Sequence, residues 1–417
     1  MRFIADFHVH SRYSRATSRD MEVETLARWA KLKGIKLLGT GDFTHPTYFA
    51  ELSARLEPVQ DGLFRVKRGE RSTLFMLTGE VCNIYHQGGR LRKIHTLIFA
   101  RETRDVERLN SKLQRYGKLS SDGRPIFTFS VKDLVKMVLD ISPSFVLIPA
   151  HAWTPWFGLF GANSGFDSLE ECFEDEIGNI FAIETGLSSD PPMNWRLSAL
   201  DRMTLISNSD AHSPSRIGRE ANVFDCELSY SEICDVLRKK DPKRFLFTIE
   251  FFPEEGKYHY DGHRKCNVVF SPAESIQHSK VCPVCKKPLT VGVCHRVEEL
   301  ADREPGVVPD GAIPARNLIP LEEIIGEALG VASSATSVRR EYLRIVQTCG
   351  SEFEVLLERP LDELSRHIPR TIVEGISAVR AGRVKIIPGH DGVFGKIGIL
   401  RDEEKDGVSA TEQMRIF

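Results

Sequence analysis

Short apolar runs alternate with amphipathic stretches through the first 240 residues of the chain. Helical periodicity fills several of the intervals, at 21–32, 131–139 and 195–200. Apolar strands that alternate with helices predict a parallel sheet, and this many repeats predict a barrel. The runs that we expect to form strands are 1–10, 35–42, 74–80, 94–99, 145–151, 180–184 and 205–212.

Most of these strands end in a side chain that can bind a metal. His8 and His10 are two residues apart on a strand, so both imidazoles project from the same side. In a β/α barrel, active sites gather at the C-terminal ends of the strands. Any one such residue could be a satisfied polar group, but the convergence of eight favours a metal site. The strand-end candidates are His8, His10, Asp42, Glu80, His151, Glu184, Asp210 and His212.

Imidazole and carboxylate ligands in this mixture suit zinc, manganese or iron. A carboxylate such as Glu80 can bridge two ions, and paired ions activate water and offset the charge of phosphate oxygens. Hydrolysis of a phosphate ester is therefore the expected reaction, and it needs no separate protein base.

The order of these residues resembles the PHP (polymerase and histidinol phosphatase) family over residues 1 to about 240. The resemblance implies an α/β fold, a PHP-type distorted (β/α)7 barrel, that binds two or three divalent ions (Zn, Mn or Mg). We expect Asp210, Glu80 and His212 to be catalytic, because a carboxylate there can hold a metal and orient the attacking water. The metal ligands that the resemblance implies are His8, His10, Asp42, Glu80, His95, His151, Asp210 and His212.

Two departures from the family leave the third metal open. Phe43 stands directly after Asp42, where the family often has a histidine. After the first histidine pair the chain offers only Asp20 as a ligand, and His45 is a further open candidate.

An aromatic loop, 152–160, follows the strand that ends at His151. Trp153, Trp156 and Phe157 in this loop are candidate substrate-binding residues, forming a stacking wall for a base pulled out of a duplex. The alternative is a hydrophobic lid packed on the rim of the barrel.

Two ligand pairs, His263-x2-Cys266 and Cys282-x2-Cys285, are separated by fifteen residues and predict one structural zinc in a Cys3His site. His278 and Cys294 are rival fourth ligands. We prefer His263, because its spacing to Cys266 mirrors the second pair, and we expect Cys294 to be a buried thiol on a strand.

The chain is thereby divided into a phosphoesterase barrel (1–240), a zinc-binding module (241–304) and a helical C-terminal domain (305–417). The tail after Arg401 is charged, and we expect it to be mobile. The stretches expected to form C-terminal helices are 321–329, 338–346, 361–367 and 372–379, while 352–358 is open between helix and extended chain.

The combination of motifs resembles the endonuclease Q family over nearly the whole chain. It rests on Gly39–Asp42, Ala150–Trp156, Ser207–Pro214, the two zinc pairs and Ile386–Gly389. The resemblance implies a metal-dependent DNA repair endonuclease that hydrolyses the phosphodiester 5′ to deaminated bases (uracil, hypoxanthine, xanthine) and to abasic sites, with the damaged nucleotide flipped out. The alternatives are a small-molecule phosphomonoesterase of the histidinol-phosphate phosphatase type and a nucleic-acid-binding protein with vestigial metals. The intact ligand set argues against the second.

A net charge of −2 excludes a globally basic nucleic-acid coat but allows a local basic groove. The sequence has no apolar run of membrane-spanning length and no signal peptide, so we expect a cytoplasmic protein whose cysteines are thiols or metal ligands. We expect a monomer whose partner is lesion-containing DNA and which does not bind membranes. Interaction with a replication clamp stays open, because the tail shows no clear clamp-binding peptide.

Overall fold

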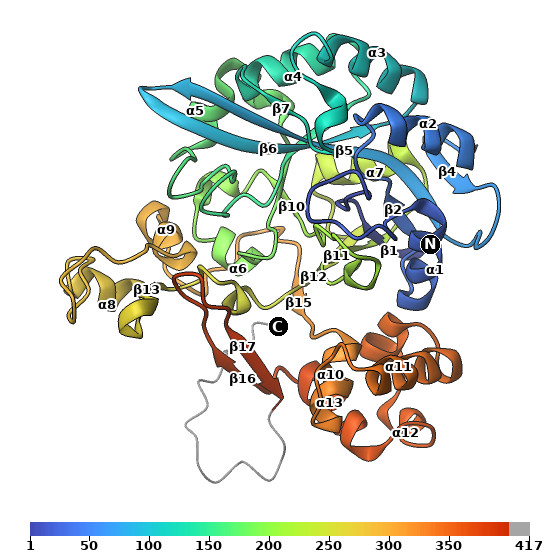
Figure 1. The fold of residues 1–417 in the computed structure, drawn as a ribbon, viewed down its shortest axis with the longest axis vertical. Helices are drawn as coiled ribbons and strands as arrows, with labels where there is room; N and C mark the ends of the chain where they lie inside the picture. Colours follow the sequence, from blue (N-terminus) through green and yellow to red (C-terminus); the bar gives the residue numbers. More distant parts are fainter. Residues whose placement is uncertain (400–417) are drawn as a thin grey trace.

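The computed structural model describes residues 1–399 (Figure 1). An 11-stranded mixed sheet forms its centre, and smaller two-stranded sheets lie beside it. The strands are β1 (Arg2–Asp6), β2 (Leu37–Gly39), β3 (Leu56–Gln60), β4 (Leu63–Val66), β5 (Leu74–Gln87), β6 (Arg90–Ala100), β7 (Ile126–Phe127), β8 (Val146–Pro149), β9 (Ala182–Glu184), β10 (Thr204–Ile206), β11 (Ala221–Asp225), β12 (Phe245–Glu250), β13 (Asp261–His263), β14 (Val268–Phe270), β15 (Ala315–Asn317), β16 (Val384–Ile387) and β17 (Lys396–Ile399). The α-helices are α1 (Val23–Lys33), α2 (Pro46–Arg55), α3 (Thr103–Leu113), α4 (Val131–Leu139), α5 (Leu169–Phe173), α6 (Pro191–Asn194), α7 (Tyr230–Lys239), α8 (Pro272–Gln277), α9 (Val293–Leu300), α10 (Leu321–Leu329), α11 (Thr336–Cys349), α12 (Leu361–Leu364) and α13 (Arg370–Arg380).

Backbone hydrogen bonds join seven strand segments in a ring, which we call the strand ring. β1, β2 and β5 pair in parallel, β6 lies antiparallel between β5 and β8, and β9 pairs in parallel with β10. Beyond the ends of β8 and β9, Ala152 N–H donates to the Glu184 carbonyl at 2.9 Å. Beyond β1 and β10, Val9 bridges Ala211, and His10 N–H donates to the Ala211 carbonyl at 3.0 Å. These contacts bring the strand ends, with their histidines and carboxylates, to one place.

All seven expected strands are present, but the expectation of a parallel sheet is only partly right. β5 and β6 form a long antiparallel ribbon, 14 and 11 residues long, and β6 is also antiparallel to β8. The helix expected at 195–200 is wrong, because α6 ends at Asn194 and extended Leu197 separates it from a short 3-10 turn at Ser198–Leu200.

Two further parts follow the ring (Figure 1). The hairpin β13–β14, α8 and α9 lie on one side of it, and helices α10–α13 lie on another. Helices α10, α11 and α13 cover three of the stretches expected to be helical, and α12 covers the first four residues of the stretch 361–367. A π-helical turn occupies Glu354–Glu358. The charged tail after Arg401 lies outside the described residues. Among the residues described, no helix is long and apolar enough to cross a membrane.

A buried ion pair joins the helical part to the ring. Lys33, at the end of α1, donates to Glu352 Oε2 at 2.8 Å, and both side chains are about 4% exposed. Tyr342 Oη donates to the same oxygen at 2.9 Å, and Leu321 N–H donates to the other at 3.0 Å. Each oxygen of Glu352 thus has a donor, which is what a buried charge requires.

Glu352→Ala should lower the free energy of unfolding by about 3–5 kcal/mol, because it leaves Lys33 buried and unpaired. Chemical denaturation measures the loss. Lys31→Ala, on the same helix as Lys33, is the control, since Lys31 pairs with Glu70 in solvent and should contribute less than about 1 kcal/mol. Equal effects of the two substitutions would contradict this account of the junction.

Candidate metal centre and substrate cavity

Two buried carboxylates fix the orientation of the histidine pair that follows β1. The two oxygens of Glu184 lie 3.0 and 3.1 Å from His8 Nδ1, and Asp42 Oδ1 lies 3.0 Å from His10 Nδ1. A carboxylate on Nδ1 holds the proton there and leaves Nε2 free to bind a metal. Both Nε2 atoms point toward Asp210 and Glu80, where the deprotonated nitrogens would bind a metal.

The two Nε2 atoms converge on Asp210, which lies beyond the end of β10. Asp210 Oδ1 is 3.0 Å from His10 Nε2 and 3.6 Å from His8 Nε2. All three atoms are buried and have no hydrogen-bond partner. Ligands about 2.0–2.2 Å from a tetrahedral zinc lie roughly 3.3–3.6 Å apart, so these atoms fit a divalent metal.

A second group of possible ligands consists of Glu80, His95 and His151. Glu80 Oε1 is 2.8 Å from His95 Nδ1 and 3.1 Å from His151 Nε2. Its other oxygen, Oε2, is 3.3 Å from His10 Nε2 and 3.6 Å from His8 Nε2. Glu80 thus divides its two oxygens between the two groups, as a carboxylate that bridges paired metals does.

Burial and neighbouring charges shift the pKa values of the histidines and carboxylates in the centre. Burial by itself disfavours protonated His8, but the charges of Glu184, Asp210 and Glu80 outweigh it and raise its pKa well above the ordinary value. Burial would likewise raise the pKa of Glu80, yet the charges around it hold that pKa well below its usual range. Burial lowers the pKa of His95 to about 4. Ionised carboxylates in a closed space of this kind favour a cation.

Several predicted ligands lie outside the two groups. Asp42 was expected to be a metal ligand, but its second oxygen accepts hydrogen bonds from Ser11 N, Ser11 Oγ and Ser14 Oγ at 2.6–2.8 Å. Asp42 therefore orients His10 and does not join either ligand group. The ring of His212 lies 4.5 Å from that of His10 at the edge of the centre. His45 accepts from Tyr48 N–H at the start of α2, and Asp20 is exposed. Within residues 1–399, no third group of ligands gathers around Asp42.

Arg124 belongs to the centre and was missed by the sequence analysis. Its Nη1 donates to Glu80 Oε2 at 3.0 Å from a turn between α3 and β7. Gly123 lets this turn approach, since a Cβ there would lie 2.2 Å from an oxygen of Asp42. Arg124 follows no strand end, so the pattern that revealed the other residues could not reveal it.

A cavity of about 850 Å³ opens beside the centre and includes His151 and Asp210 in its wall. Its wall is largely aromatic and carries both signs of charge: three cations, and the carboxylates of Glu255 and Glu323, of which Glu323 pairs with Arg216 at 2.7 Å. The aromatic residues are Trp156, Phe157, Phe251, Tyr258 and Phe394, and the cations are Arg216, Arg219 and Lys257. A planar apolar group beside an anion fits such a wall.

The prediction for Trp153 is wrong. Its indole is 1% exposed, donates to Asn194 Oδ1 at 2.8 Å and packs against Phe160 at 4.9 Å, so it offers no face to a base. Trp156 and Phe157 do line the cavity, and Trp156 is 42% exposed. In the aromatic loop, Trp153 is therefore buried in the protein, whereas Trp156 and Phe157 line the cavity.

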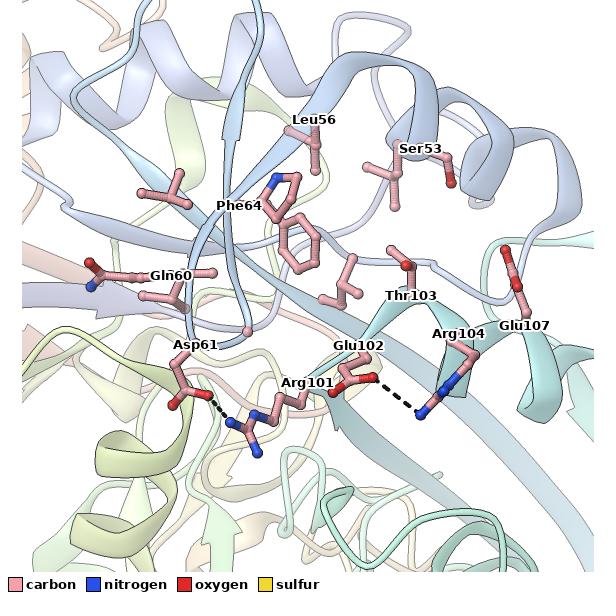
Figure 2. Close-up of a pocket in the computed structure, with 16 residues that line it drawn as sticks. Ser53, Leu56, Gln60, Asp61, Phe64, Arg101, Glu102, Thr103, Arg104 and Glu107 are labelled. Carbon is pink, nitrogen blue, oxygen red and sulfur yellow. Dashed lines mark ion pairs between the residues drawn. The ribbon is translucent and has the colours of Figure 1, made fainter.

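Figure 2 shows a second hollow, lined by residues of α2, β3, β4 and the start of α3. Leu56, Phe64 and Gln60 contribute to it, and ion pairs join Arg101 to Asp61 and Arg104 to Glu102. Among the described residues, none of the candidate metal ligands lines this hollow, so it offers no comparable chemistry.

The zinc-module residues gather as expected. The ligand atoms of His263, Cys266, Cys282 and Cys285 all lie within 4.8 Å of one another. The rivals lie elsewhere, since His278 stacks on Phe270 at 4.6 Å and Cys294 Sγ contacts His259 Nε2 at 3.1 Å. The strand expected to carry Cys294 is wrong, because Cys294 lies in the first turn of α9.

Cys282→Ser and His263→Ala should each remove one equivalent of zinc from the purified protein, because each takes a ligand from the Cys3His group. Atomic emission counts the metal. His278→Ala and Cys294→Ser are the matched controls and should retain full zinc. Zinc loss in the controls, or none in the first pair, would overturn the assignment.

Comparison with known proteins places the chain in a family. A family model described as the MJ0043 C-terminal domain matches residues 320–383. The uncharacterized protein MJ0043 of Methanocaldococcus jannaschii is 31% identical over 257 residues, which cover 59% of this chain and 31% of that protein. The chain thus spans about a third of the length of this curated relative.

Two solved structures match over their whole length. The crystal structure of the lesion-specific endonuclease PfuEndoQ from Pyrococcus furiosus has a TM-score of 0.85 and 30% identity, and the match covers 98% of this chain and 100% of that one. A structure of endonuclease Q with a 27-mer duplex, with an abasic lesion at the active site, has a TM-score of 0.84 and 30% identity over all of both chains. The chain belongs to the endonuclease Q family.

Proposed function

We propose that this protein is a metal-dependent DNA repair endonuclease that hydrolyses the phosphodiester 5′ to uracil, hypoxanthine, xanthine and abasic sites. One observation carries the proposal: Glu80 turns one oxygen to each of two ligand groups, beside an aromatic cavity bordered by cations. Membership of the endonuclease Q family supports it, since solved members are lesion-specific and bind duplex DNA with an abasic lesion.

The proposal includes the architecture. The strand ring corresponds to a PHP-type distorted (β/α)7 barrel over residues 1–240, followed by a zinc-binding module (241–304) and a helical C-terminal domain (305–417). β12, within the range 241–304, and β15, within the range 305–417, pair with each other in the large sheet, so both of the later parts begin on it.

His8, His10 and Asp210 would hold one divalent ion, and His95 and His151 would hold a second, with Glu80 between them. When bound, paired ions activate water and offset the negative charge of a phosphate. Glu184 and Asp42 keep the two imidazoles in the metal-binding tautomer. His212, at the open edge, is placed to contact the phosphate or a ligand water.

Arg124 would bind the scissile phosphate. Its guanidinium lies on the Glu80 oxygen that faces His8 and His10, and its side chain is 27% exposed toward solvent. A planar guanidinium can donate to the carboxylate and to a phosphate oxygen together. Arg216, Arg219 and Lys257 would meet the neighbouring phosphates, which position the DNA without reading its sequence.

The cavity would receive the flipped nucleotide. Trp156 and Phe157 offer aromatic surface next to His151, so a base stacked there leaves its phosphate at the metals. Flipping requires less free energy at a mispaired or baseless site, which favours lesions over intact pairs.

Nicking assays test this function directly. With Mn²⁺ or Zn²⁺ present, the protein should nick duplexes that contain uracil, hypoxanthine or an abasic site on the 5′ side of the lesion, leaving 3′-hydroxyl and 5′-phosphate ends. It should leave undamaged duplex intact and hydrolyse phosphomonoesters poorly. Release of phosphate from small monoesters without nicking would instead indicate a phosphatase of the histidinol-phosphate type.

Asp210→Asn should abolish nicking while the protein stays folded, because an amide cannot take the place of the charged oxygen between His8 and His10. Initial nicking rates and thermal denaturation measure the two effects. Asp20→Asn is the control, since Asp20 is exposed and lies outside both ligand groups. Nicking by Asp210→Asn at a near-normal rate would contradict the assignment of Asp210 as a metal ligand.

Trp156→Ala should slow cleavage at uracil and hypoxanthine about ten- to hundred-fold and at an abasic site much less, because an abasic site has no base to stack. Single-turnover rates on the three substrates measure the difference. Equal slowing on all three, with normal metal content, would mean that Trp156 positions the DNA backbone.

A further inference from the structure

The loop between β16 and β17 (Figure 1), residues 388–395, contributes Phe394 and Gly395 to the wall of the cavity, and we call it the hairpin tip. Phe394 in this tip is 69% exposed and lines the same cavity as His151 and Asp210. Val393 beside it is 42% exposed. Exposed apolar residues are common on protein surfaces, so the exposure of Phe394 alone does not indicate a function. The contacts that hold the hairpin tip provide further evidence.

The hairpin tip is fixed against the segment that forms the cavity rim. Gly389 N–H donates to the Glu254 carbonyl at 2.8 Å, Gly395 N–H to the Glu255 carbonyl at 3.0 Å, and Gly392 N–H to the Lys257 carbonyl at 2.8 Å. A Cβ on Gly395 would lie 2.1 Å from the Glu254 carbonyl oxygen, so only glycine permits this approach. The exposed phenylalanine therefore stands on a rigid support.

The tip is also tied to the Cys3His group. Asp391 Oδ2 accepts from the backbone N–H of Arg264, the residue after His263, at 2.7 Å. Its other oxygen accepts from Thr290 Oγ1 at 2.6 Å. Since Arg264 lies between two of the grouped ligands, His263 and Cys266, an ion there would hold the tip as well as the module.

We propose that Phe394 enters the duplex at the lesion and fills the gap that the flipped nucleotide leaves in the base stack, with the Cys3His group as the anchor of the hairpin tip. This inference rests on the proposed function. A flipped nucleotide leaves two base faces without a stacking partner, and an apolar wedge restores the contact and keeps the nucleotide out. Phe394 lines the cavity from the hairpin tip, whereas Trp156 and Phe157 line it from the loop after β8, so different side chains are available for the gap and for the flipped base.

The charges around the tip suit DNA. The Lys257 ammonium lies 5.6 Å from the ring of Tyr258 and 5.8 Å from that of Phe394, and it is exposed. Arg264, whose backbone is bonded to Asp391 in the tip, and Lys396, which directly follows the tip, are both exposed. Cations that flank an apolar wedge can meet the phosphates of the strand that the wedge enters.

The test compares Phe394→Ala with the wild type on one uracil-containing sequence in three forms: duplex, duplex with the uracil in an unpaired bubble, and single strand. Cleavage efficiency on the duplex should fall about ten- to hundred-fold, because one stacking surface is lost. The fall should be smaller on the bubble and smallest on the single strand, where no gap in a base stack has to be filled. Ile387→Ala is the matched control, since Ile387 is 51% exposed on the same hairpin but does not line the cavity.

Asp391→Ala tests the anchor. It should lower duplex cleavage and leave single-strand cleavage unchanged, because it frees the tip without touching the cavity wall. Equal loss on duplex and single strand by Phe394→Ala would overturn the wedge and make Phe394 a wall for the base itself. Unchanged duplex cleavage would also overturn it. Absence of nicking by the wild type on every substrate would instead refute the proposed function.

Discussion

The carboxylate of Glu80 is buried among four imidazoles and one guanidinium, and the arrangement of the centre depends on it. Its oxygens face His95 and His151 on one side and His8, His10 and Arg124 on the other. No single charge is stable in such a space without partners, so the surrounding carboxylates and histidines must be held in fixed positions. Glu184 and Asp42 do this for the histidine pair, and the contacts that complete the strand ring bring both to the same place.

Three junctions hold the turn of Arg124, the hairpin tip and the helical part in place. The turn that carries Arg124 is pressed against Asp42 by Gly123, and the hairpin tip is held by Asp391 between Arg264 and Thr290. Lys33 and Glu352 join the helical part to the first helix of the ring. Each junction joins segments that are far apart in sequence, and its polar contacts fix how these segments lie relative to each other.

Sequence periodicity predicted the seven strands of the ring and the helices at 21–32 and 131–139, but not the other helices of the first 240 residues. Polar residues at strand ends indicated most of the side chains that gather at the centre, while His95 was indicated only by the family resemblance. Periodicity could not distinguish the antiparallel β5–β6 ribbon from parallel strands, because strand direction depends on the connection and not on the residues. It could not separate Trp153 from Trp156, since burial depends on which side of an irregular loop each ring takes. Arg124 and Phe394 lie in turns, where no repeating pattern marks a functional residue.

The central claim is that Glu80 joins two metal ions. Anomalous X-ray scattering from crystals grown with Mn²⁺ tests it most directly. The account predicts two peaks about 3.5–4 Å apart, one beside His8, His10 and Asp210 and one beside His95 and His151, with an oxygen of Glu80 on each. A single peak, or two peaks that Glu80 does not join, would contradict the account.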